Sequence, residues 1–251
     1  MMDSISRFSN RVENYVKYRP SYPPEVLQLC KNEMGLTGES TVADVGSGPG
    51  ILARHFLENG NIVYCVEPND GMRAAAEDIL KGFAGFRSVK GDSENTTLPD
   101  ASIDLVTAAQ AFHWFRPEPT KREFQRIIKP GGYAALIWNV RQLDSTPFLR
   151  EYEQFIKDNA NDYGAVRHEN ITEAEIGAFF DSGYKKASFD NVQIFDFEGL
   201  RGRLFSSSYM PAEDSEKGRA VVSGLRELFE RYSREGKIEI LYDTDIFYSK
   251  F

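Results

Sequence analysis

The chain has 251 residues, of which 41% are apolar and 27% charged, and its formal net charge is −8 at pH 7. This composition is typical of a globular protein and excludes disorder, collagen-like repeats and coiled coils as the main architecture. An acidic chain lacks the broad basic face that binds the phosphates of nucleic acids or anionic lipids, so we expect neither nucleic acid nor a membrane as a partner.

The cysteine pattern and the hydropathy indicate a cytoplasmic protein. Cys30 and Cys65 stand in apolar contexts without a CxxC spacing or a nearby histidine, which is typical of reduced core residues and gives no sign of a metal site. The first residues form no apolar run of the signal-peptide type, and no stretch approaches the ~20 apolar residues that span a bilayer. We expect a monomer or a homodimer.

Five short apolar runs predict β-strands in the first part of the chain. Most of them are hydrophobic almost without interruption, which is typical of strands buried on both faces of a parallel sheet. The predicted strands cover Thr41–Val45, Ile62–Val66, Phe86–Lys90, Ile103–Ala108 and Tyr133–Trp138.

Helices are predicted between these strands. One covers Ile51–Asn59, and the next begins at Asn69, a good N-cap. The pattern Thr120-x-x-Glu123 predicts a capping box for a further helix, which is expected to stop at Pro130-Gly131-Gly132. The alternation of strand and helix indicates a doubly wound α/β fold.

The flanking regions add further elements. Pro24 and Gly35 bracket a predicted helix over Glu25–Met34. The later part of the chain predicts helices over 144–160, 172–181 and 213–234 and strands over 189–197 and 237–251, the two strands forming an antiparallel pair at one sheet edge. We expect a single domain over 1–251, because no Pro-, Gly- or Ser-rich linker divides it.

A glycine-rich loop, Asp44–Gly50 (DVGSGPG), lies directly between the first predicted strand and its helix. Glycines are needed where φ is positive or where a ligand approaches the backbone closely. Glu67, at the end of the second strand, can accept hydrogen bonds from both hydroxyls of a ribose. These features alone fit a dinucleotide or another adenosine-containing cofactor. The dinucleotide fingerprint G-x-G-x-x-G is broken, however, because Ile51 occupies its sixth position.

The segment VADVGSGPG resembles the first motif of class I S-adenosylmethionine-dependent methyltransferases. Further matching segments follow in order: Glu67 in VEPND, the turn Gly91-Asp92-Ser93, LPDASIDLVTAAQAFHWF and IIKPGGYAALIWN. The resemblance spans residues 41–140. It implies a Rossmann-like methyltransferase fold with a mostly parallel seven-stranded sheet, an antiparallel edge strand, an N-terminal helical lid over 1–38, and a substrate cover with a helical insertion over 141–251.

A second resemblance concerns the substrate. The segments Phe8–Pro23 and Gln110–Phe115, together with the closing strand, are similar to the trans-aconitate methyltransferase-like group. This resemblance implies methyl transfer from S-adenosylmethionine to a small, anionic organic acceptor, most simply at oxygen, by in-line displacement and without a metal, with S-adenosylhomocysteine as product. The alternatives are an NAD-dependent oxidoreductase and a non-catalytic S-adenosylmethionine-binding protein.

The resemblance assigns cofactor contacts to residues that follow the strands. The glycines would let the backbone lie against the methionine part, Glu67 would bind the ribose, and Asp92 would face the adenine amino group. Asp44 would orient the loop or meet the cofactor's ammonium group. Asp92 and Met72 could instead have ordinary structural roles, because Gly-Asp-Ser is a common turn and Met72 can be a core residue. The expected cofactor residues are Asp44, Gly46, Gly48, Gly50, Glu67, Met72, Asp92, Ser93, Tyr15 and Gln110.

The acceptor side is expected near the N-terminal segment. Residues 1–19 carry four basic and two acidic side chains, a balance of +2, and tyrosines lie among them. We predict a lid that closes over the cofactor with Arg19 toward a carboxylate; the alternative is a docked terminus whose aromatic rings pack. The candidate acceptor-binding residues are Tyr18, Arg19, His113, Trp114, Arg141, Arg203 and Tyr209, with Arg201 as a weaker candidate.

His113 is the candidate catalytic residue, because it follows the fourth strand at the edge where ligands of such sheets bind. A hydroxyl or amine acceptor would need a general base, which His113 could supply. A carboxylate acceptor needs none, because it is already anionic at neutral pH. His113 would then contact the substrate or close the site.

Overall fold

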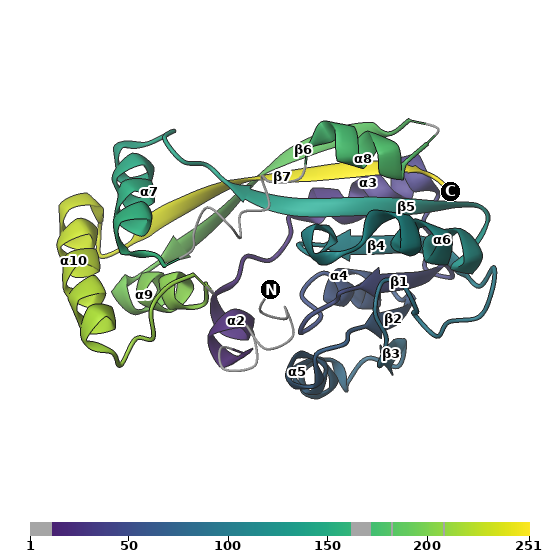
Figure 1. The fold of residues 1–251 in the computed structure, drawn as a ribbon, viewed down its shortest axis with the longest axis horizontal. Helices are drawn as coiled ribbons and strands as arrows, with labels where there is room; N and C mark the ends of the chain where they lie inside the picture. The colour runs from purple at the N-terminus through teal and green to yellow at the C-terminus, as the bar shows by residue number, and fades with distance from the viewer. Residues whose placement is uncertain (1–11, 162–171, 182, 208) are drawn as a thin grey trace.

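The computed structural model describes residues 12–161, 172–181, 183–207 and 209–251 (Figure 1). It contains a seven-stranded sheet in which the first five strands run parallel. The last strand of the chain is antiparallel to both of its neighbours, so the predicted α/β class with antiparallel pairing at one edge is confirmed. The order is β3 (Phe86–Val89), β2 (Ile62–Val66), β1 (Thr41–Val45), β4 (Ile103–Ala109), β5 (Ile128–Arg141), β7 (Ile238–Lys250) and β6 (Lys185–Phe195).

The strands differ greatly in length, and this difference shapes the molecule. β1 to β4 have four to seven residues, whereas β5 has 14, β7 has 13 and β6 has 11. The three long strands therefore extend beyond the short ones (Figure 1). Where β5 runs past the end of β4, its residues Asn139–Arg141 still pair with Tyr242–Thr244 of β7.

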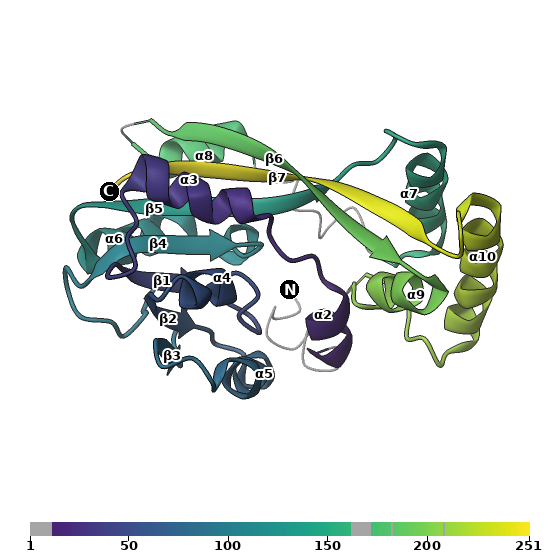
Figure 2. The ribbon, with the colours of Figure 1, turned by 180° about the vertical axis from the view of Figure 1, so that it is seen from behind.

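Helices cover both faces of the sheet (Figures 1 and 2). α3 (Pro24–Met34), α4 (Ala53–Glu58) and α5 (Asp70–Leu80) pack on one face through one apolar cluster. α6 (Pro117–Ile127) and α8 (Glu173–Phe179) pack on the other face through a second cluster. The sheet is therefore buried on both sides, as the near-continuous apolar runs predict.

A third apolar cluster lies at the far end of the long strands. α7 (Pro147–Asn159), α9 (Phe197–Phe205) and α10 (Glu216–Tyr232) pack there against the first residues of β7. The short helix α2 (Val12–Tyr18) lies between this helical unit and α5, and it contacts both α9 and α5 (Figures 1 and 2). Of the predicted lid over 1–38, residues 1–11 lie outside the described part of the chain. That 1–251 is one domain stays a prediction.

Several predicted boundaries are confirmed by their capping contacts. Asn69 caps α5, because its Oδ1 accepts a hydrogen bond from the Met72 amide at 3.0 Å. Pro24 begins α3, and Gly35 ends it in the left-handed conformation with φ 70°. Local chemistry therefore fixes these helix ends.

The predicted capping box at Thr120 and Glu123 is wrong. α6 begins earlier, with Pro117 in its first turn, so both residues lie inside the helix. Their side chains bond to a neighbouring loop instead of to the helix end: Thr120 Oγ1 lies 2.9 Å from Ser93 Oγ, and Glu123 accepts from Thr96. The helix also ends at Ile127 and passes directly into β5, so Pro130 lies within that strand.

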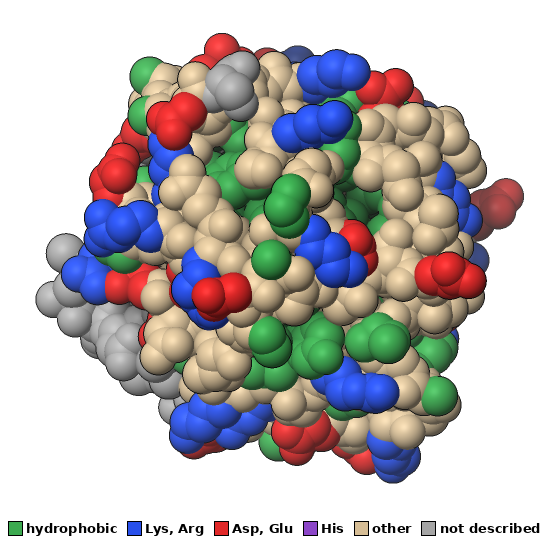
Figure 3. All heavy atoms as spheres, turned by 90° about the vertical axis from the view of Figure 1, so that its right-hand side faces the viewer, with side chains coloured by type: hydrophobic (Ala, Val, Ile, Leu, Met, Phe, Trp, Pro, Cys, Tyr) green, Lys and Arg blue, Asp and Glu red, His purple; other side chains and the backbone are tan. Residues whose placement is uncertain are grey.

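The face of the molecule drawn in Figure 3 carries both positive and negative side chains. On that face, lysine and arginine side chains are interspersed with aspartate and glutamate. Within the described residues, none of the helices is both long enough and apolar enough to cross a membrane.

Candidate cofactor and acceptor sites

A cavity of about 370 Å³ lies at the carboxyl ends of the parallel strands. This volume falls within the range of about 300–1,000 Å³ that is typical of small-molecule sites. Its walls come from the segments that follow β1, β2, β3 and β4 and from α2 and α5. The lining residues are Tyr15, Gly46, Gly48, Glu67, Pro68, Asn69, Met72, Asp92, Ser93, Glu94, Gln110, Ala111, Trp114 and Phe115.

The three glycines of the loop after β1 have different roles. Gly46 has φ 69°, and a Cβ there would lie 2.7 Å from the Cβ of Ala111, so packing requires glycine. Gly48 has φ 54°, lines the cavity, and has no atom within 4 Å of a Cβ position. Gly50 does not line the cavity, and a Cβ there would meet Leu80 at 2.5 Å. Gly48 is therefore the position at which the backbone is open to a ligand.

Glu67 both faces the cavity and holds the glycine loop. It is 7% exposed, and its Oε2 accepts a hydrogen bond from the Gly48 amide at 2.8 Å. Its Oε1 accepts one from the Asn69 amide, also at 2.8 Å. Burial raises the pKa of this carboxyl, and the two amide hydrogen bonds oppose that rise. The carboxyl keeps its second acceptor lone pairs for a ligand hydroxyl.

Asp44 lies beneath the loop and not in the cavity wall. Its side chain is 1% exposed, Thr107 Oγ1 donates to Oδ1 at 2.8 Å, and Oδ2 has no hydrogen-bond partner among the described residues. Burial raises the pKa of Asp44 to about 7, although the Thr107 hydrogen bond lowers it. An under-satisfied buried carboxyl directly below an open glycine loop suits a cationic group of a ligand above it.

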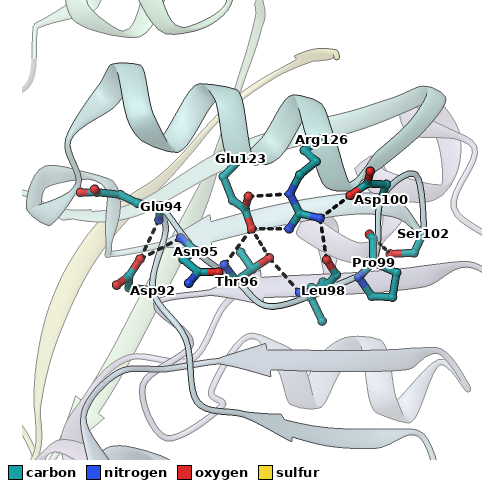
Figure 4. Close-up of polar contacts among 10 residues, drawn as sticks. All are labelled: Asp92, Glu94, Asn95, Thr96, Leu98, Pro99, Asp100, Ser102, Glu123 and Arg126. Atoms are coloured by element: carbon teal, nitrogen blue, oxygen red, sulfur yellow. Dashed lines mark hydrogen bonds and ion pairs between the residues drawn. The ribbon is translucent and has the colours of Figure 1, made fainter.

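Asp92, Ser93 and Glu94 form the wall that follows β3. Asp92 Oδ1 accepts hydrogen bonds from the amides of Glu94 and Asn95, so this segment is the ordinary turn that its sequence permits (Figure 4). The same segment lines the cavity, so being an ordinary turn does not prevent it from facing a ligand.

The remaining cavity residues come from α2, α5 and the segment after β4. Tyr15 and Met72 reach the cavity from the two helices. Gln110 has φ 54°, an unusual conformation for a residue other than glycine, and its Nε2 donates to the Asn139 carbonyl at 3.0 Å. Sequence reasoning missed Pro68, Asn69, Glu94, Ala111 and Phe115, although each lies within two residues of a predicted site residue along the chain.

The charge of the cavity distinguishes between the possible cofactors. Glu67, Asp92 and Glu94 line it, and within the described residues its lining includes neither lysine nor arginine. Such a lining suits the sulfonium and ammonium groups and the ribose hydroxyls of S-adenosylmethionine. A dinucleotide pyrophosphate would meet three carboxylates, and the Gly48 amide, a donor of the kind that binds phosphate, already donates to Glu67. The residues therefore fit the methyl donor better.

A second cluster of predicted residues gathers on the other side of Tyr15. The Arg19 guanidinium stacks on the Tyr15 ring at 4.8 Å and donates to the Ser206 carbonyl at 3.2 Å, at the end of α9. Arg203, which is 8% exposed, donates to the Tyr242 hydroxyl at 3.1 Å. Burial lowers the pKa of Arg19, and the positive charge of the nearby Arg203 lowers it further.

The other predicted acceptor residues differ in whether they form ion pairs and in whether they lie near these two arginines. Arg141 pairs with Glu153 and lies over the Tyr152 ring, whose electrostatic environment includes Arg141, Arg203 and Tyr209. Arg201 lies outside the group, because it pairs with Glu198 and Glu213.

Tyr18 packs α2 against α9. A Cβ at Gly202 would lie only 2.0 Å from the Tyr18 ring, so the glycine makes room for it. This contact fixes α2, and with it Tyr15 and Arg19, between the cavity and the distal helices. The predicted acceptor role of Tyr18 stays a prediction.

His113 and Trp114 lie in a single 3-10 turn, η1 (Phe112–Trp114), directly after β4. Their rings are 4.9 Å apart, and Trp114 lines the cavity. His113 is placed beside the cavity and not among its lining residues. In the described residues there is no group of three or more His, Cys, Asp or Glu side chains that could hold a metal ion.

Known proteins similar to this chain are methyltransferases. A family model described as a methyltransferase domain matches residues 43–136. An uncharacterized methyltransferase of Schizosaccharomyces pombe is 28% identical over 240 residues, which cover 92% of each chain. One of Mycobacterium tuberculosis is 33% identical over 158 residues, 61% of this chain and 60% of the relative.

Solved structures share the fold. A protein of Anaeromyxobacter dehalogenans, proposed to be a type II methyltransferase, superimposes with a TM-score of 0.68 at 18% identity and covers 93% of this chain and 98% of its own. An S-adenosylmethionine-dependent methyltransferase of Geobacter sulfurreducens, solved with S-adenosylhomocysteine, has a TM-score of 0.53 at 18% identity over 98% of this chain and 97% of its own.

Proposed function

Because this chain is a class I S-adenosylmethionine-dependent methyltransferase, we propose that it methylates a small, anionic organic acceptor at oxygen. The cofactor would occupy the acid-lined cavity, with Gly48 against its methionine part and Glu67 at its ribose. The acceptor would lie beyond Tyr15, at the arginines between α2 and α9. A similarity of the N-terminal and His113 segments to the trans-aconitate methyltransferase-like group supports the same acceptor class.

The arginine pair carries this proposal. Arg19 and Arg203 approach each other inside a protein of net charge −8, and neither forms an ion pair within the described residues. Two neighbouring cations away from water are unfavourable unless an anion joins them. A carboxylate would neutralise both, and the planar guanidinium geometry binds a carboxylate with two hydrogen bonds.

The chain's own part in the reaction is mainly positioning. When bound, S-adenosylmethionine supplies a methyl group on a positively charged sulfur, and the acceptor oxygen takes this methyl as the carbon–sulfur bond breaks. Tyr15 lines the cofactor cavity and stacks on Arg19, so it separates and aligns the two ligands. Holding both reactants in line supplies much of the catalysis that such a displacement needs.

His113 has a limited role in this proposal. A carboxylate acceptor is already ionised at neutral pH, so no proton has to be removed. His113 and Trp114, in the turn beside the cavity, would contact the acceptor and exclude water. A cytoplasmic setting is in keeping with the free, buried thiols of Cys30 and Cys65.

The test pairs an acceptor screen with one substitution. Small carboxylic acids and their neutral amides are incubated with S-adenosylmethionine and the chain, and methyl esters are detected by mass spectrometry. We expect esters of the acids alone. Arg203→Gln should raise the acceptor KM about tenfold or more, because a charged hydrogen bond is lost, and should leave S-adenosylhomocysteine affinity unchanged.

Arg201→Gln is the matched control, because Arg201 lies on the same helix but pairs with Glu198 and Glu213. It should leave the acceptor KM unchanged. Equal methylation of the neutral amides, or an unchanged KM in Arg203→Gln, would refute an anionic acceptor at this site.

A further inference from the structure

One face of α6 bonds to the loop that forms a wall of the cofactor cavity. Residues at helix positions i, i+4, i+7 and i+10 share a face, and these positions are polar when counted from Arg116, the N-cap of α6. Each of them contacts the segment 93–100, which follows β3. The four side chains are Arg116 with Glu94, Thr120 with Ser93, Glu123 with Thr96, and Arg126 with Leu98 and Asp100.

Glu123 is the centre of this network (Figure 4). Its Oε1 accepts hydrogen bonds from the amide of Thr96 at 2.8 Å and from its hydroxyl at 2.6 Å. Arg126 donates to both carboxylate oxygens, at 2.7 and 2.8 Å, and these contacts lower the pKa of Glu123 although burial opposes them. Thr96 is fully buried and Glu123 is 7% exposed, so the hydrogen bonds between these two residues are shielded from water.

Thr120 contacts a residue that lines the cavity. Its hydroxyl lies 2.9 Å from that of Ser93, and the two residues are 0% and 6% exposed. Ser93 lines the cavity, whereas Thr120 does not. A change at Thr120 can therefore reach a ligand only through Ser93 or the backbone that carries it.

We propose that Thr120 and Glu123 are positioning residues of the cofactor site. They hold the Asp92–Glu94 wall at its place in the cavity, so that a ligand meets a wall already fixed. The backbone of this wall is closely packed at its start, since a Cβ at Gly91 would lie 2.9 Å from the Asn95 carbonyl oxygen. This inference rests on the proposed assignment of the cavity to S-adenosylmethionine.

A merely structural role predicts a different result from a positioning role. If the network only fastens helix to loop, its loss lowers stability and leaves ligand affinity intact. If it positions the wall, cofactor affinity falls while the acceptor KM stays the same. The two readouts together therefore distinguish the roles.

The experiment titrates S-adenosylhomocysteine into Thr120→Val and Thr120→Ser by calorimetry. Thr120→Val keeps the shape but loses the hydroxyl, and we expect about fivefold weaker binding. Thr120→Ser restores the hydroxyl and should bind like the wild type. Ile127→Val, a fully buried change on the same helix, is the control for lost stability and should bind normally.

A double-mutant cycle tests the route through Ser93. In a Ser93→Ala background, Thr120→Val should add no further loss of affinity, because its partner is already gone. Glu123→Gln should weaken binding about threefold with an unchanged acceptor KM. Normal affinity in Thr120→Val would refute positioning. If the wild type binds no S-adenosylhomocysteine, the assignment of the cavity fails instead. Affinity is referred to the folded fraction measured by circular dichroism.

Discussion

The two proposed binding sites, one for the cofactor and one for the acceptor, are built from side chains of opposite charge. At the cofactor end, short parallel strands deliver glycines and the carboxylates Glu67, Asp92 and Glu94 to one cavity. At the distal end, Arg19 bonds to the carbonyl of Ser206 at the end of α9, the helix that carries Arg203, and tyrosines lie near both arginines. Tyr15 contacts both groups. The acidic end suits the cationic methyl donor, and the basic end suits an anionic acceptor.

This contrast also concerns how each site is built. The cofactor cavity uses residues directly after consecutive strands, so the strand order alone brings them to one edge. The arginine cluster joins the N-terminal segment to a helix almost two hundred residues later, since Arg19 bonds to Ser206 with a separation of 187 residues. The first site follows from local motifs, and the second depends on the packing of distant elements.

The largest expected effect is a loss of cofactor affinity from a change in the cofactor cavity alone. Gly48→Val places a branched side chain at φ 54° and toward the cavity, which adds backbone strain and occupies the ligand's space. We expect S-adenosylhomocysteine affinity to fall about a hundredfold or more, equivalent to about 2.7 kcal/mol, as measured by calorimetric titration.

Gly35→Val is its matched control. Gly35 has φ 70° and, like Gly48, no atom within 4 Å of a Cβ position, but it ends α3 and does not line the cavity. It should lose comparable stability and keep its affinity. Equal loss of affinity in the two variants would mean that strain, and not access to the cavity, explains the Gly48 result.

Much of the cofactor end could be predicted from the sequence. The glycine loop, Glu67, Asp92 and Gln110 follow strands that the sequence predicts, and each of these residues or segments reaches the cavity. Asp44 and Gly50 are exceptions, because neither lines the cavity and the tertiary packing decides where each of them lies. Asp44 lies under the loop, and Gly50 makes room for Leu80.

The distal end and the α6 network could be predicted only as a set of candidates. Arg19, Arg141 and Arg203 stand on separate elements, and no spacing shows that Arg141 pairs with Glu153 while Arg203 does not pair with an acid. Thr120 and Glu123 matched a capping pattern, yet Pro117 begins the helix one turn earlier. Local patterns cannot reveal partners that only the tertiary fold supplies.

The next effect concerns the charge beneath the cofactor end. Burial raises the pKa of Asp44 from 3.8 to about 7, so folding favours its protonated form. That contribution to stability is complete below pH 3.8 and is lost as the pH rises through about 7. Between pH 5 and pH 8, the wild type should lose unfolding free energy on the order of 2 kcal/mol that Asp44→Asn does not lose.

Urea unfolding at both pH values measures this difference. Asp190→Asn, which changes an exposed residue of β6, is the control and should follow the wild type. Parallel pH dependence in the wild type and Asp44→Asn would contradict a raised pKa at this position. Asp44 would then be fully ionised at neutral pH even without a bound cation.

The smallest expected effect is a change in acceptor binding that leaves cofactor affinity unchanged. Tyr242 is 1% exposed, and its hydroxyl accepts from Arg203 Nε at 3.1 Å and donates to Gln193 Oε1 at 2.9 Å. Gln193 in turn donates to the Tyr18 carbonyl at 3.1 Å, so this hydroxyl connects the arginine to α2. Tyr242→Phe removes the connection but leaves the Arg203 charge in place.

We therefore expect Tyr242→Phe to raise the acceptor KM about threefold, because Arg203 loses one orienting hydrogen bond, with cofactor affinity unchanged in calorimetry. Tyr248→Phe, on the same strand, loses a hydroxyl that lies 3.4 Å from Glu33, far from α9, and should leave both values unchanged. A change in cofactor affinity in Tyr242→Phe would show that the two ends are coupled through α2, because Tyr18 and Tyr15 belong to the same short helix.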